Sequence, residues 1–185
     1  MFIIYKIIII YLYLFLIFFS SIGYGFFFKK LVLKDNYNSN IFELYLLSIP
    51  LLTFIGIFIH FFYKIDFLIV ILINFLGLLF FTIYSKKINY KNTLKIIFFV
   101  TIFLFPFLLG NSLHEDFYYH HLPYLNLINS YKIIFGLVNF NDVLANPYMS
   151  WFNYSALFAL PPYKFELNFI INYLFFFCFI SFLTA

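Results

Sequence analysis

Long runs of apolar residues dominate this chain, and charged residues interrupt them only rarely. A helix needs roughly 20 apolar residues to cross the hydrocarbon core of a bilayer. The runs that approach or exceed this length are 2–28, 41–63, 67–84, 96–110 and 167–185. We therefore expect an all-α fold, a polytopic bundle of about five transmembrane helices, whose first partner is the lipid bilayer.

The composition excludes the main classes of soluble protein. Hydrophobic residues make up 65% of the chain and charged residues 10%, whereas a soluble domain is about 45–50% apolar and about 25% charged. This balance excludes a soluble enzyme, a nucleic-acid-binding domain and a disordered chain. The single cysteine, Cys178, lies in an apolar run and can form no internal disulfide.

The charges between the apolar runs predict the orientation in the membrane. Residues 29–40 carry three lysines against one aspartate, and residues 86–95 carry four lysines and no acid. Residues 111–166 carry two lysines against four acids. Because basic loops stay in the cytoplasm, we expect 29–40 and 86–95 inside, and the N-terminus and 111–166 outside.

Three parts follow from this pattern. Residues 1–110 would form a four-span membrane bundle, and residues 111–166 an extracytoplasmic loop with juxtamembrane helices. Residues 167–185 would begin a fifth span that is cut short, so we expect the chain to be an N-terminal fragment of a longer protein.

The long outer loop contains two helix patterns. Pro123 suits a first helical turn and Gly136 a terminator. Four apolar residues recur between them at helical spacing: Leu125, Ile128, Tyr131 and Ile134. This pattern predicts an amphipathic helix at the membrane surface. A second short helix is expected from Trp151 to Leu160, ended by Pro161 and Pro162.

Most of the few carboxylates have a structural explanation. Asn40 and Glu43 fit a capping pair before the second run, and Asp66 fits an N-cap of the third. Glu166 falls in the first turn of the last run, where the helix dipole favours it. Asp116, which lies among histidines and tyrosines, has no such explanation.

Asp116 allows three interpretations. A carboxylate beside imidazoles could act as a general base. Asp116 and His120, four residues apart on one helix face, could also hold a divalent metal, although we expect no cofactor. The third interpretation, which the residues alone favour, is a polar loop cap with interfacial histidines.

Polar residues within the apolar runs carry a competing hypothesis. His60 is a functional candidate because it lies inside a span, although a hydrogen bond to a neighbouring helix is the favoured interpretation. A transport path would need further polar residues, and the candidates are Asn74, Thr53 and Thr101. The alternative function is therefore a non-enzymatic membrane protein, such as a transporter or flippase component, or an inactive fragment.

Three stretches of the chain resemble a signature found in poorly characterised bacterial polytopic membrane proteins. They are HEDFYYHHLPY (114–124), IIFGLVN (133–139) and SWFNYSALFALP (150–161). These proteins are similar in layout to membrane-embedded glycosyltransferases of the GT-C type. The resemblance implies a multi-pass protein of the bacterial inner membrane. It would move a sugar from a polyprenyl-phosphate carrier during cell-surface glycan assembly.

The resemblance also implies roles for individual residues. Asp116 would be the catalytic base, with Glu115 as its catalytic neighbour. The substrate-binding residues would be His120, His121, Tyr119 and Lys132. The reaction would be displacement at the anomeric carbon, with the lipid phosphate as leaving group.

Overall fold

The computed structural model describes residues 2–34, 40–85, 95, 98–99, 102–103, 122–136, 149–162 and 164–183. Within these ranges every regular element is a helix, which confirms the all-α class. The elements are α1 (Phe2–Phe28) with its π-helical continuation η1 (Lys29–Leu33), α2 (Ile41–Phe62), α3 (Phe67–Tyr84), α5 (Leu122–Ser130), α6 (Met149–Ala156) and α7 (Lys164–Leu183).

Three of these helices are long and apolar enough to cross a membrane. They cover Tyr5–Val32, Ile41–Phe62 and Phe67–Tyr84, which are the first three spans expected from the sequence. Their length and composition agree with a membrane protein. The fourth expected span, 96–110, lies almost entirely outside the described residues. Among the described side chains of α7, the apolar stretch is Ile171–Leu183. Five spans therefore remain a prediction.

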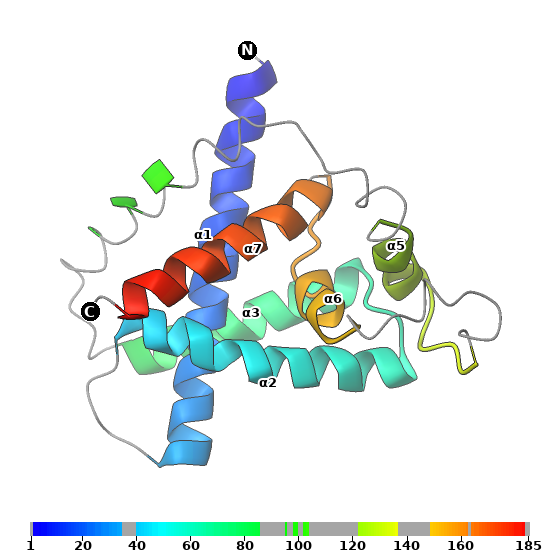
Figure 1. Ribbon diagram of the computed structural model, residues 1–185, viewed down its shortest axis with the longest axis horizontal. Helices are drawn as coiled ribbons and strands as arrows, with labels where there is room; N and C mark the ends of the chain where they lie inside the picture. Colours follow the sequence, from blue (N-terminus) through cyan, green and yellow to red (C-terminus); the bar gives the residue numbers. More distant parts are fainter. Residues whose placement is uncertain are drawn as a thin grey trace.

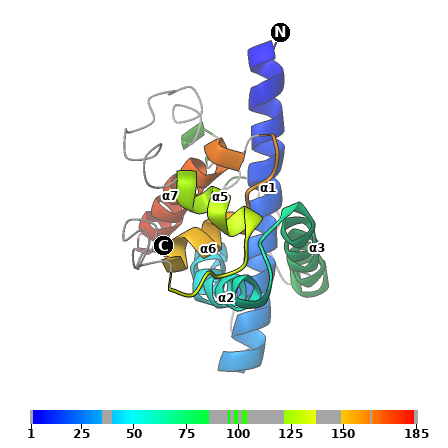
Figure 2. The same cartoon turned by 90° about the vertical axis from the view of Figure 1, so that its right-hand side faces the viewer.

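Helix α1 crosses α2 and α3 steeply instead of lying alongside them (Figure 1). Figure 2 shows the same arrangement from the side, with α2 and α3 seen nearly end-on while α1 runs across the view. Among the three candidate spans, α2 and α3 therefore run roughly along one direction, and α1 crosses both. A steep crossing concentrates the contact between two helices in a short stretch of each.

Small residues occupy these crossings, where the backbones come close together. A Cβ atom at Gly23 would collide with the carbonyl oxygen of Gly77 in α3, and one at Gly25 would collide with the carbonyl oxygen of Leu44 in α2. Small residues at helix contacts are a general feature of membrane bundles, because they let backbones approach. The hydroxyl of Tyr24 adds a hydrogen bond of 2.9 Å to the carbonyl oxygen of Ile73.

Local signals set the starts of α2 and α3. The side chain of Asn40 accepts a hydrogen bond from Phe42 N at 3.1 Å, and that of Asp66 accepts one from Ile69 N at 3.2 Å. Both N-caps agree with the sequence prediction. Glu43 has a different role from the one expected, because its carboxylate accepts a hydrogen bond from Lys29 Nζ at 3.0 Å.

The segment between α3 and α7 has a helix at each of the two positions where the sequence pattern placed one. Helix α5 ends at Ser130, before the expected terminator Gly136, which has a left-handed φ of 77°. Helix α6 begins at Met149 and ends at Ala156, shorter than the expected Trp151–Leu160. It lies in the interior of the protein against α2, not on its surface, and Tyr154 is fully buried.

Candidate functional site

The stretch that carries the candidate acid leads directly into α5. Five of the residues expected to form the site lie outside the described residues: Glu115, Asp116, Tyr119, His120 and His121. The sixth, Lys132, is described and has an exposed side chain. Helix α5 begins at Leu122, directly after His121. The contacts that hold α5 in place therefore also hold the point where the candidate stretch ends.

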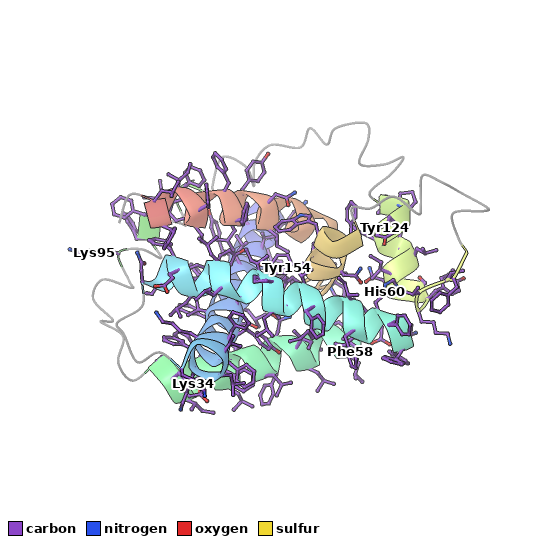
Figure 3. The ribbon with its side chains drawn as sticks, turned by 60° about the horizontal axis from the view of Figure 1, so that its bottom comes forward. Lys34, Phe58, His60, Lys95, Tyr124 and Tyr154 are labelled. Atoms are coloured by element: carbon purple, nitrogen blue, oxygen red, sulfur yellow. The ribbon has the colours of Figure 1, made fainter. Side chains whose placement is uncertain are left out.

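Three hydrogen bonds attach α5 and the residues after it to the last turn of α2 and to the turn between α2 and α3. Ile65 N donates to the carbonyl oxygen of Ile128 at 3.1 Å, and Ile133 N donates to that of His60 at 2.9 Å. The third bond joins His60 Nε2 and the carbonyl oxygen of Tyr131 at 3.1 Å. A carbonyl oxygen can only accept, so Nε2 is the ring nitrogen that carries the hydrogen. Figure 3 shows His60 at this end of α2, facing the α5 segment.

This attachment fixes the main chain on both sides of Lys132. Tyr131 precedes it and accepts from His60, while Ile133 follows it and donates to the carbonyl oxygen of the same residue. His60 is buried, with 3% of its surface exposed. The main chain of Lys132 is thus held beside the end of α2, while its side chain is exposed. In the sequence α5 separates this residue from the candidate acid.

A second group of contacts holds α6 against α2 and α3. A Cβ atom at Gly56 would lie 2.9 Å from the carbonyl oxygen of Asn153, so the backbones of α2 and α6 touch. The hydroxyls of Tyr45 and Tyr154 lie 3.2 Å apart in the interior. Burial raises the pKa of Tyr154 above its ordinary value, so this hydroxyl stays neutral. These contacts position α6 without supplying a charged group.

Asn74 in α3 holds the residues that directly follow α6. Its side-chain nitrogen donates to the carbonyl oxygen of Val70 at 2.8 Å and to that of Leu157 at 3.1 Å. His60 and Asn74 were the main candidates for a polar path through the spans. Both donate to main-chain carbonyls of the segment between α3 and α7, so their described contacts are structural.

Two more hydrogen bonds join α6 and the residues that follow it to α7 and α1. The indole N–H of Trp151 donates to Asn172 Oδ1 in α7 at 2.7 Å, and the hydroxyl of Tyr13 donates to the carbonyl oxygen of Pro161 at 3.0 Å. The sequence pattern placed Trp151 in a short helix, but it contained no signal for the hydrogen-bond partner of this residue. Pairs so far apart in the chain become visible only when the helices are placed.

The described part of the chain supplies little chemistry of its own. Its carboxylates with described side chains are Glu43, which pairs with Lys29, and Asp66, which caps α3. Within the same ranges no three His, Cys, Asp or Glu side chains come close enough to hold a metal ion. Burial raises the pKa of Tyr124 in α5 to about 12, so this phenol is neutral at ordinary pH.

Comparison with known proteins adds no further constraint. No family model, no curated protein and no solved structure matches the chain. The motif pattern of residues 114–161 and the attachment of α5 are therefore the observations from which a function can be argued.

Proposed function

We propose that the chain is part of an integral membrane glycosyltransferase of the GT-C type. It would move a sugar from a polyprenyl-phosphate carrier to an acceptor hydroxyl on the outer side of a bacterial inner membrane. The observation that carries the proposal is the attachment of α5. The stretch containing Asp116 ends where α5 begins, and α5 is hydrogen-bonded to the α2–α3 turn. A catalytic group needs such support, since small displacements reduce its efficiency.

The proposed reaction needs one base and one cation. The carboxylate of Asp116 takes the proton of the acceptor hydroxyl while the oxygen of that hydroxyl forms a bond to the anomeric carbon. The bond from the anomeric carbon to the phosphate oxygen breaks, and polyprenyl phosphate leaves. Lys132, whose main chain is fixed by its two neighbours, would compensate the charge of the leaving phosphate.

The remaining residues of the motif would position the substrates. Glu115 precedes the base, and Tyr119, His120 and His121 follow it on the same stretch. Imidazole and phenol groups can donate hydrogen bonds to sugar hydroxyls or to phosphate oxygens. A divalent metal held by Asp116 and His120 is the alternative source of positive charge.

Transfer from a labelled polyprenyl-phosphate sugar, measured in membranes containing the full chain, tests this proposal. Asp116→Asn keeps the size of the side chain and removes the base, so transfer should fall by about 100-fold or more. Asp142→Asn is the matched control, because it removes another acid of the same loop and should leave transfer unchanged. Equal transfer by the wild type and Asp116→Asn would exclude Asp116 as the base.

A further inference from the structure

The ends of α1 and α3 meet at a place rich in lysine. The rings of Phe27 and Phe80 stack with their centroids 4.5 Å apart, and Lys30 Nζ lies 4.7 Å from the centroid of the Tyr84 ring. Lys34 follows on the same end of α1 and is labelled there in Figure 3. The chain therefore brings Lys30 to the C-terminal end of α3, and Lys34 follows four residues later at the end of η1.

The lysines at this place differ in their charge partners. Lys29 is buried and its charge is matched by Glu43, with Nζ and Oε1 3.0 Å apart. Lys30 and Lys34 are exposed, and neither is in an ion pair with another described residue. In the sequence two more lysines, Lys86 and Lys87, come directly after Ser85. Among the described residues at this end of the helices, three lysines stand against the single carboxylate of Glu43. In the sequence, Asp35 adds one negative charge beside Lys34.

The opposite end of α2 and α3 offers a contrast. There Lys64 has an acid close by, since its Nζ lies 3.6 Å from Asp66 Oδ2. Helices α2 and α3 and the turn between them form a hairpin. Its two ends differ in charge, because the lysine at the turn has an acid beside it, although each end carries an exposed lysine beside an apolar helix. This difference supplies a control within the same chain.

Exposed apolar side chains lie next to the unpaired lysines. Leu31 is 59% exposed and Val32 58%, and both follow Lys30 directly. Ile83, which precedes Tyr84 in α3, is 55% exposed. A free anion has no apolar part that could contact these side chains. A phospholipid has a charged headgroup that can contact the lysines and acyl chains that can contact the apolar residues.

We propose that the junction of η1 and the end of α3 binds an anionic phospholipid. Lys30 and Lys34 hold the headgroup phosphate, and the acyl chains lie along Leu31, Val32 and Ile83. The ring of Tyr84 beneath the Lys30 ammonium restrains that side chain through a cation–π contact. Lysines close to an anionic membrane surface each strengthen lipid association. The proposal is independent of the glycosyltransferase reaction.

Lipid retention by the purified chain in a neutral detergent tests the proposal. Phosphatidylglycerol or phosphatidylcholine is added, and the number of lipids bound is measured by native mass spectrometry. We expect phosphatidylglycerol to be retained in preference. Lys30→Gln should weaken its binding by about fivefold, and the Lys30→Gln/Lys34→Gln pair by about 25-fold. Lys30→Arg keeps the charge and should retain the lipid.

The control variant is Lys64→Gln, which removes an exposed lysine at the other end of the hairpin. It should leave binding of phosphatidylglycerol unchanged. Equal weakening by Lys30→Gln and Lys64→Gln would overturn the proposal, because it would show that the lipid is attracted to positive charge in general and not to a defined site. Equal retention of the two lipids would overturn it as well. Displacement of the lipid by millimolar inorganic phosphate would show that the site takes free phosphate instead.

Discussion

The carbonyl oxygen of Asn153 lies 2.9 Å from the place where a Cβ atom of Gly56 would be. The obstructing atom is backbone, which cannot rotate away as a side chain can. Helix α6 therefore rests directly on α2 at this point, and both the Tyr45–Tyr154 contact and the Asn74–Leu157 bond depend on that position.

Gly56→Ala should displace α6 from α2. We expect the free energy of unfolding in detergent to fall by about 1–3 kcal/mol, as for an added methyl group in a packed interior. The chain has a single tryptophan, Trp151, and it lies on α6, so its fluorescence reports on this helix directly. Phe58→Leu, at an exposed position of α2, is the control. Unchanged stability together with unchanged Trp151 emission would contradict the contact.

Asn74→Leu should destabilise the protein by removing the bond to the segment after α6. The side chain keeps its approximate volume but loses the donor to Leu157, and we expect a loss of about 1 kcal/mol. Thr82→Val is the matched control on α3, because the Thr82 hydroxyl donates only to Leu79 within its own helix. Asn74→Leu with wild-type stability but altered solute flux would instead favour the transport hypothesis.

Tyr124→Phe should stabilise the protein slightly. The Tyr124 hydroxyl is buried and has no hydrogen-bond partner within the described residues. Removing it relieves a desolvation cost of about 1 kcal/mol. A destabilised Tyr124→Phe variant would show that the hydroxyl has a stabilising partner.

Tyr124 also predicts a pH dependence. Burial raises its pKa from 10.0 to about 12, so the folded state favours the neutral phenol. Below pH 10 the phenol is neutral in both the folded and the unfolded state, and stability is unaffected. As the pH rises from 10 through 12 the unfolded state ionises first, so stability is lost. Helix content followed by circular dichroism should fall less steeply over this range in Tyr124→Phe than in the wild type. Tyr131→Phe, at an exposed tyrosine, should follow the wild-type curve.

Features fixed by neighbouring residues were predictable from the sequence. The apolar runs predicted α1, α2 and α3, because length and composition alone decide whether a helix suits a bilayer. Asn40 and Asp66 were predicted as N-caps because a cap depends on residues two or three positions away. His60 was expected to bond a neighbouring helix, and it donates to the carbonyl oxygen of Tyr131, the residue directly after α5.

Features fixed by distant parts of the chain were not predictable. The spans are apolar on all sides, so nothing in them indicated that α1 crosses the other two. The position of α6 in the long outer loop predicted a surface helix, yet Asn153 and Ser155 are buried. Burial is possible because the Ser155 hydroxyl donates to the carbonyl oxygen of Phe152 at 3.1 Å, within the helix itself. The catalytic residues of the proposal lie outside the described ranges, so their roles stay predictions.

The close helix crossings set glycine apart from the residues that dominate the composition of this chain. Phenylalanine, isoleucine and lysine are encoded mainly by A and T, whereas every glycine codon begins with two G. With 33 phenylalanines and six glycines, the chain reflects strong drift toward A and T. The glycines that the structure describes are Gly23, Gly25, Gly56, Gly77 and Gly136. Each lies where a larger side chain would collide with a neighbour or strain the backbone, so the helix crossings tolerate no side chain at these positions.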